Sequence, residues 1–254
     1  AMASVPSFNP HNRHVIPSGA LKNRVSADLF EPGSTVKPFV IAMALEKKII
    51  TPQTTINTNP GRLKIGKYVV KDAINHGVLD IGDILKKSSN IGVTKIIHQT
   101  QPHDFPLFLK GLGFGLSPLG LPGEAKGFVP SFQQKKLFPM ATLAFGYGLS
   151  ASTLQLAQAY ATLGNFGQTV KPQLIIGQLN QNETFTTLLS PQTARQVLVM
   201  LERVVKAGGT GVKAQVSGYR VAGKTGTSRK IGVNGYDYNA FVALFAGLIP
   251  ANNP

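Results

Sequence analysis

Two side chains near the start of a predicted helix could together activate a nucleophile. Ser34 and Lys37 are the ends of the segment Ser34-Thr35-Val36-Lys37, and this spacing puts both side chains on one helix face. A serine hydroxyl needs a base to take its proton, and lysine can act as that base when burial or nearby positive charge lowers its pKa. We therefore expect Ser34 to be a catalytic nucleophile and Lys37 its base. Taken alone, the pair would fit a capping serine and a surface lysine better.

A second polar group interrupts an apolar segment, residues 81–99, that otherwise predicts a helix. The interruption is Ser88-Ser89-Asn90. In a catalytic site, Ser88 would relay a proton between Lys37 and a leaving amine. Asn90 would hold Lys37 and hydrogen-bond a substrate amide. The alternative is a solvated loop between two helices.

A third motif, Lys224-Thr225-Gly226-Thr227, follows the predicted strand 219–222. A glycine within a strand permits another backbone to come close, and a peptide substrate can lie along an edge strand. The hydroxyls of Thr225 and Thr227 could bind a substrate carboxylate, and Lys224 would add a positive field. We expect the backbone N–H groups of Ser34 and Thr227 to form an oxyanion hole.

Residues 218–225 also match the P-loop pattern G-x-x-x-x-G-K-[ST]. A P-loop needs a strand before its first glycine and a helix after its lysine. Here the predicted strand lies inside the motif, and the residues after Lys224 show no helical period. The sequence therefore disfavours nucleotide binding.

The remaining pattern predicts an α+β fold, and 254 residues are enough for one large domain or two small ones. Residues 100–135 contain many glycines and predict loops. The segment 190–205 begins with Ser-Pro and has apolar residues at helical spacing. The other predicted elements are helices at 35–45 and 154–163, the end of a strand at 1–6, and a strand at 239–248 that pairs with 219–222 across the connection 232–239.

The composition excludes several kinds of site. The chain has no cysteine, so it has no disulfide, thiolate zinc site or cysteine nucleophile. His98 and His103 flank a proline-containing loop, which is a poor geometry for zinc, and we expect no metal. The net charge is +15 over 254 residues, but the basic residues form no long tract. This favours a solvated basic surface over a nucleic-acid partner.

Membrane attachment is not predicted within residues 1–254. No apolar run approaches the roughly 18 to 20 residues that a membrane-spanning helix needs, and the chain opens without a basic leader. We expect any anchor or export signal to lie outside this sequence.

The three motifs, with further segments, resemble class B penicillin-binding proteins, and in particular the septal transpeptidase type, penicillin-binding protein 3. The resemblance covers nearly the whole chain. The additional segments that carry it are Pro6-Ser7-Phe8-Asn9-Pro10, Phe30-Glu31-Pro32-Gly33 with Ser34, Lys87 with Ser88-Ser89-Asn90-Ile91-Gly92-Val93, Phe145-Gly146-Tyr147-Gly148-Leu149 and Leu154-Gln155-Leu156-Ala157.

This resemblance implies a penicillin-binding/β-lactamase-like fold, with an antiparallel sheet flanked by helices and a helical subdomain. It implies that Ser34 is acylated by the penultimate D-alanine of a peptidoglycan stem peptide, and that an amine on a neighbouring stem then takes the acyl group. β-Lactams would acylate the same serine. No metal or organic cofactor is expected. The implied place is the periplasmic face of the bacterial inner membrane, with cell-division proteins as partners.

Two departures from the family pattern stand out. Ser152-Thr153 precedes Leu154 where the family usually has a Thr-Pro pair. The strand inventory also lacks the first and fifth strands of the family sheet. We therefore expect residues 1–254 to be one transpeptidase domain truncated at both ends, with an incomplete sheet and without the pedestal domain or anchor.

Three related functions remain as alternatives to a transpeptidase: a D,D-carboxypeptidase, a serine β-lactamase and a non-catalytic β-lactam sensor. A class A lactamase needs a glutamate that activates water. The sequence has no E-x-x-L-N-like segment after Ser88-Ser89-Asn90, and Glu124, Glu183 and Glu202 lie in other contexts. The septal-type segments argue against a sensor.

Overall fold

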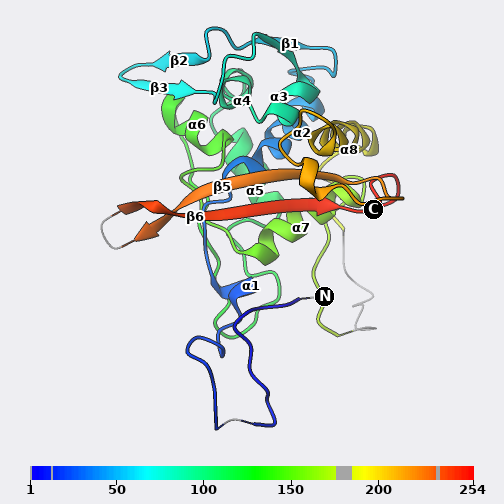
Figure 1. The fold of residues 1–254 in the computed structure, drawn as a ribbon. Coiled ribbons are helices and arrows are strands. Elements are labelled where there is room, and N and C mark those ends of the chain that lie inside the picture. Colours follow the sequence, from blue (N-terminus) through cyan, green and yellow to red (C-terminus); the bar gives the residue numbers. More distant parts are fainter. Residues whose placement is uncertain (1, 13, 176–184, 233–234) are drawn as a thin grey trace.

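The computed structural model describes residues 2–12, 14–175, 185–232 and 235–254. A long hairpin crosses the middle of the molecule, with helices on both of its sides and two small two-stranded sheets at one end (Figure 1). This arrangement confirms the α+β prediction. The elements are α1 (Arg24–Ala27), η1 (Gly33–Val36), α2 (Lys37–Glu46), β1 (Thr55–Asn57), β2 (Arg62–Ile65), β3 (Tyr68–Lys71), β4 (Val78–Asp80), α3 (Ile81–Lys87), α4 (Asn90–Ile97), α5 (Asp104–Gly111), α6 (Leu137–Ala144), α7 (Thr153–Gly164), α8 (Pro191–Val205), η2 (Val212–Ala214), β5 (Ala222–Gly232) and β6 (Gly235–Leu248).

Helix α2 forms the centre of the hydrophobic core. Its sequence is apolar all round, and every residue from Lys37 to Leu45 is buried. Such a helix is stable only when neighbours cover it on every side. Helices α4, α5 and α8 pack against it, and Phe39 makes edge-to-face contacts with Phe114 and Tyr160.

Helix α8 confirms the prediction for residues 190–205. The Ser190 side chain caps it by accepting a hydrogen bond from the Thr193 N–H, and Pro191 occupies the first turn, where its missing N–H costs nothing. Its apolar face packs against α2, α3 and β5. The prediction for residues 154–163 is likewise confirmed by α7. A capping box begins this helix: the Ser152 hydroxyl accepts from the Gln155 N–H, and the Gln155 side chain accepts from the Ser152 N–H.

The predicted hairpin is present, but its strands are longer than expected. Ala222 pairs with Leu248, and the antiparallel ladder runs out to Arg229 and Phe241. Residues 219–221 precede the strand. They follow a turn in which the Tyr219 N–H donates to the Val216 carbonyl. The third motif therefore lies inside β5. Most of the predicted connection 232–239 belongs to β6, and its positions 233 and 234 lie outside the described residues.

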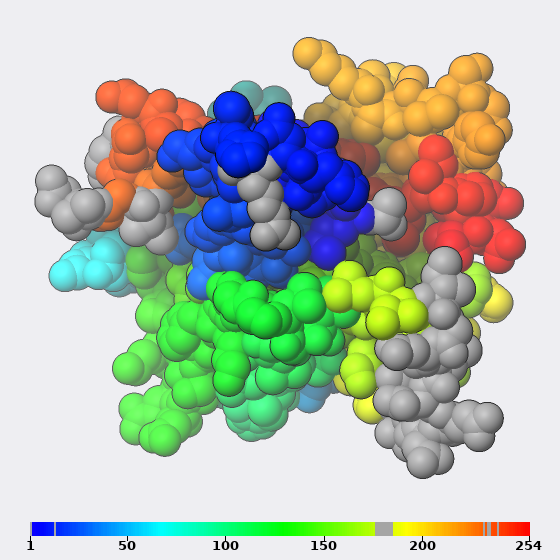
Figure 2. Space-filling model, turned by 90° about the horizontal axis from the view of Figure 1, so that it is seen from below, coloured from blue at the N-terminus to red at the C-terminus, as the bar shows by residue number. Residues whose placement is uncertain are grey.

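The prediction of a strand at residues 1–6 was wrong for its described part, residues 2–6. Pro6 has no N–H to donate to a ladder, and Val5 is exposed. Its side chains accept hydrogen bonds from the rest of the chain, from the Arg24 N–H to the Ser4 hydroxyl at 3.4 Å and from the Asn23 Nδ2 to the Met2 sulfur at 3.5 Å. Seen from below, the N-terminal segment lies on the surface of the molecule beside residues of the 100–150 region (Figure 2).

Residues 100–135 contain a helix that the loop prediction missed. At the start of helix α5, Asp104 accepts a hydrogen bond from the Gln101 N–H at 3.0 Å, and Pro106 stands in the first turn. Beyond α5 the segment is irregular, and Gly113, Gly115 and Gly120 have positive φ. None of the helices in the described part of the chain has an apolar stretch long enough to cross a bilayer.

Candidate active site

Ser34 lies in the short helix η1, directly before α2. Thr35 fixes this turn, because its hydroxyl donates to the Pro32 carbonyl at 2.7 Å and its own carbonyl accepts from the Tyr160 hydroxyl at 2.9 Å. The residue before Ser34 must be glycine. Gly33 has a φ of 54°, and a Cβ there would lie 2.8 Å from the Thr227 carbonyl oxygen. Ser34 is therefore held half-exposed beside the middle of β5.

Lys37 lies one turn further and is completely buried. Its Nζ donates to the Ser88 carbonyl at 2.6 Å, to the Asn90 Oδ1 at 2.7 Å and to the Ser88 Oγ at 3.2 Å. All three acceptors are neutral. The structure thus brings Lys37, Ser88 and Asn90 together as the sequence predicts.

The backbone between α3 and α4 explains how Ser88 reaches Lys37. Ser88 caps the C-terminus of α3 in the left-handed conformation, with a φ of 57°. Ser89 begins α4 by accepting a hydrogen bond from the Gly92 N–H at 2.8 Å. The predicted break in the helix is confirmed, and it turns both the carbonyl and the hydroxyl of Ser88 toward the Lys37 amine.

Lys224 of β5 is the second fully buried amine of the site. Its Nζ donates to the Ser88 Oγ at 2.9 Å and to the Thr225 carbonyl at 3.2 Å. The Ser88 hydroxyl therefore lies between two amines that come from different elements, α2 and β5. A hydroxyl in that position can accept a proton from one side and donate one to the other.

Burial sets the protonation of both amines. It lowers the pKa of Lys224 to about 7. The pKa of Lys37 is also well below its ordinary value, first because burial strips the ammonium of water, and second because the Lys224 charge repels it. The Asp72 carboxylate opposes this shift. A lysine with a depressed pKa can hold its amine neutral and act as a base.

The other motif residues line β5 where it faces η1. Gly226 permits a close approach, but the approaching backbone belongs to this chain. A Cβ at Gly226 would lie 2.7 Å from the Thr35 Cγ2 and 2.9 Å from the Pro32 carbonyl oxygen. Together with the contact of Gly33 on Thr227, this packing places the backbones of Ser34 and Thr227 side by side. Thr225 and Thr227 are not buried.

Asp72 and Thr210 near the site escaped the sequence analysis, and Glu31 was named there only within a segment that carries the family resemblance. The Asp72 carboxylate binds the start of α4. The Thr210 and Thr225 hydroxyls lie 2.7 Å apart. Glu31 is buried and accepts hydrogen bonds from the Gly148 N–H at 2.7 Å and the Tyr236 hydroxyl at 2.9 Å. All three act through partners that are distant in sequence, so no local pattern could identify them.

The P-loop match at residues 218–225 has no structural counterpart. The residues after Lys224 continue in β5 to Gly232 rather than starting a helix, so the geometry that cradles phosphates is absent from this segment. Among the residues that the structure describes, no three histidine, aspartate or glutamate side chains gather into a group that could hold a metal ion.

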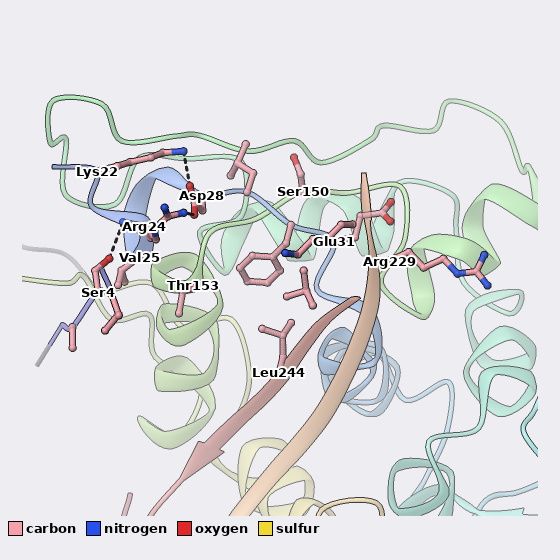
Figure 3. Close-up of a pocket in the computed structure, with 16 residues that line it drawn as sticks. Ser4, Lys22, Arg24, Val25, Asp28, Glu31, Ser150, Thr153, Arg229 and Leu244 are labelled. Atoms are coloured by element: carbon pink, nitrogen blue, oxygen red, sulfur yellow. Dashed lines mark hydrogen bonds and ion pairs between the residues drawn. The ribbon is translucent and has the colours of Figure 1, made fainter. Parts of the chain in front are cut away.

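A separate cavity of about 710 Å³ lies between the N-terminal segment, α1, the start of α7 and the hairpin (Figure 3). None of the predicted site residues lines it. Its wall includes Ser4, Val25 of α1, Thr153 of α7 and Leu244 of β6.

Comparison with known proteins gives one consistent result. The family described as penicillin binding protein transpeptidase domain matches residues 1–254. A peptidoglycan D,D-transpeptidase FtsI from Buchnera aphidicola subsp. Schizaphis graminum is 40% identical over all of this chain and 44% of its own length. The protein of the same name from Escherichia coli K12 is 38% identical over all of this chain and 43% of its own length. The chain thus spans less than half the length of these relatives.

Solved structures give the same result for the fold. The apo transpeptidase domain of Burkholderia pseudomallei penicillin-binding protein 3 is 39% identical, with a TM-score of 0.87 over 92% of this chain and 71% of that one. The fold expected from the resemblance is confirmed, with its two-stranded sheets standing as separate pieces.

Proposed function

This chain belongs to the penicillin-binding protein transpeptidase domain family, and we propose that it is the catalytic domain of a septal peptidoglycan D,D-transpeptidase. Its relatives carry the name peptidoglycan D,D-transpeptidase. The observation that carries the proposal is the fully buried Lys37 amine, held by neutral groups one turn from an accessible serine.

In the proposed acylation, the neutral Lys37 amine takes the proton of the Ser34 hydroxyl. The Ser34 Oγ attacks the carbonyl carbon of the penultimate D-alanine and forms a tetrahedral intermediate. The backbone N–H groups of Ser34 and Thr227 donate to its oxyanion. The C–N bond then breaks, the proton passes from Lys37 through the Ser88 hydroxyl to the leaving D-alanine amine, and an ester remains on Ser34.

The second half of the proposed reaction reverses these roles. An amine of a neighbouring stem peptide attacks the ester and loses a proton to Lys37. The intermediate collapses, a new amide forms, and Ser34 recovers its proton. Asn90 holds Lys37 in place throughout and bonds the substrate amide.

The proposed substrate lies against β5. Thr225 and Thr227 bind its terminal carboxylate with their hydroxyls, and Lys224 supplies positive charge behind them. Gly226 keeps the strand close to η1, so that this carboxylate and the scissile bond reach their partners together. Thr225 and Thr227 are not buried, so their hydroxyls can reach a substrate, whereas Lys224 is buried and can act only through its charge.

Acylation by a penicillin tests the proposal directly. We expect an adduct of the drug's mass on the intact protein, located on the peptide that contains Ser34. Ser34→Ala should abolish it, while Ser150→Ala should not, since that half-buried serine lines the separate cavity. An adduct that survives in Ser34→Ala would overturn the assignment of the nucleophile.

The lifetime of the adduct distinguishes a transpeptidase from a lactamase. The described glutamates near the site are engaged elsewhere: Glu31 binds Gly148 and Tyr236, and Glu202 binds Arg220. Neither of these two described glutamates is thus placed to activate water, and Glu183 lies outside the described residues. We expect the adduct to persist for hours. A half-life of seconds would favour the lactamase alternative.

Location, partners and sheet completion belong to the same proposal. The proposed enzyme acts at the periplasmic face of the inner membrane, through an anchor outside this sequence, with cell-division proteins as partners. We further propose that strands from outside residues 1–254, or from a second copy of the chain, complete the sheet beyond β6. The partial cover of the solved relative, 71%, supports this. A monomeric, cooperatively melting 254-residue protein with full acylation activity would contradict it.

A further inference from the structure

A single carboxylate holds the second motif in place from outside it. Asp72 directly follows β3. Its Oδ1 accepts from the Asn90 N–H at 2.6 Å and the Ile91 N–H at 3.1 Å. Its Oδ2 accepts from the Ser89 hydroxyl at 2.6 Å. Three consecutive residues of the motif region are therefore tied to one side chain.

The carboxylate is itself fixed in position. The Asp72 N–H donates to the Gly61 carbonyl at 3.2 Å, and the neighbouring Lys71 carbonyl accepts from the Asn90 Nδ2 at 2.9 Å. This second bond turns the Asn90 amide so that its oxygen faces the Lys37 amine. The small hairpin of β2 and β3 thus acts as a bracket for the Asn90 side chain and its backbone.

We propose that Asp72 is a positioning residue of this site, which holds Ser88 and Asn90 in contact with the Lys37 amine. The proposal rests on the proposed acylation of Ser34. Helix α4 already has a cap of its own in the Ser89 hydroxyl, so the Asp72 carboxylate adds more to the placement of Asn90 than to the existence of the helix. A displacement of about 1 Å at a catalytic group can cost roughly 10²-fold in rate.

The charge of Asp72 gives the proposal a second readout. Two charged groups act on Lys37: Lys224 from β5, which lowers its pKa, and Asp72 from the loop after β3, which raises it. The other groups that face the amine, from Ser88 and Asn90, are neutral. Removing the Asp72 charge therefore lowers the pKa of Lys37 further. Since protonated Lys37 cannot act as a base, the acidic limb of the acylation rate should move to lower pH.

Two variants separate position from charge. Asp72→Asn keeps an oxygen for the Asn90 and Ile91 N–H groups, and its amide can donate to the Ser89 hydroxyl, but the charge is lost. We expect its plateau rate of acylation by a fluorescent penicillin to fall less than about 10-fold, because neutral hydrogen bonds are weaker than charge-assisted ones. Its acidic limb should move to lower pH. Asp72→Ala loses the hydrogen bonds to Ser89, Asn90 and Ile91, and its plateau rate should fall about 10²-fold.

Asp104→Asn is the matched control. It removes the same charge at the far end of α2, where Asp104 pairs with Lys47 at 2.7 Å. We expect its acidic limb to stay at the wild-type position. An Asp72→Asn limb that stays in place or moves to higher pH would overturn the proposal, as would an Asp72→Ala rate within threefold of wild type.

Hydrogen exchange distinguishes failure of this proposal from failure of the proposed function. The Asn90 and Ile91 amides should exchange faster in Asp72→Ala than in wild type and nearly normally in Asp72→Asn, whether or not the protein is acylated. Wild-type protein that forms no Ser34 adduct would refute the proposed function alone. Unchanged exchange in Asp72→Ala would refute the role of Asp72 in holding α4.

Discussion

The two ends of helix α2 each hold a lysine amine, in opposite surroundings. Lys37 at the N-terminal end is fully buried, and its three hydrogen-bond acceptors are neutral. Lys47, which caps the C-terminal end, keeps 46% of its side chain exposed and pairs with the Asp104 carboxylate at 2.7 Å. The same residue type on one helix is thus buried among neutral acceptors at one end and ion-paired near solvent at the other.

The difference shows what turns a lysine into a base. A buried ammonium loses its hydration, and this loss lowers its pKa unless a counter-charge compensates. At Lys37 the larger of the two charge effects is that of the like charge on Lys224, which lowers the pKa further. At Lys47 a carboxylate and solvent are both present. Removing each lysine in turn therefore tests whether the chemistry is confined to one end of the helix.

The largest expected effect is the loss of acylation in Lys37→Ala. Removing a positioned general base costs about 10²- to 10⁴-fold in rate, and we expect a loss in this range for acylation by a penicillin. Lys47→Ala should acylate at nearly the wild-type rate. Stopped-flow measurement with a fluorescent penicillin compares the two. Similar rates for both variants would show that another group is the base.

The next largest effect is on stability: burial of Lys224 makes the free energy of unfolding depend on pH. The pKa of Lys224 falls from 10.5 when unfolded to about 7 when folded. Between these values the unfolded state binds more protons, so the free energy of unfolding rises with pH. From pH 7 to 9 the contribution is about 2 kcal/mol, and it is lost as the pH falls toward 7. Lys224→Met should flatten this rise in melting temperature.

Lys47→Met is the control for that experiment, because it removes a lysine that is partly exposed and ion-paired. Its melting temperature should keep the wild-type dependence on pH. If Lys224→Met and Lys47→Met gave the same slope, burial of Lys224 without a counter-charge would not be the cause of the rise.

The sequence predicted some helices and contacts of this molecule correctly and missed others. Predictions were correct where the residues that determine an element lie next to one another in the sequence. Ser190-Pro191 and the apolar period after it predicted α8, and the polar interruption at Ser88 predicted the break between α3 and α4. The contact between Lys37, Ser88 and Asn90 followed from the residue types and from the family resemblance.

Long-range partners account for most of what was missed. Residues 223–227 contain two glycines, which disfavour a strand locally, but pairing with β6 and packing against η1 make them part of β5. Asp72 is separated from Asn90 by β4 and α3, and nothing in its own neighbourhood marks it as a partner. The Asp104–Lys47 pair that holds α5 to α2 was invisible for the same reason.

The smallest expected effect concerns that pair. Lys47→Ala leaves the Asp104 carboxylate, which is only 8% exposed, without its ion-pair partner. Because Lys47 is itself nearly half exposed, the cost should be about 1 kcal/mol, and for a chain of this size about 2 to 4 °C in melting temperature. Acylation should not change. The double variant with Asp104→Asn should cost less than the sum of the single changes. A fully additive cost would mean that the two side chains do not stabilise each other, and that Lys47 contributes only its own packing at this end of α2.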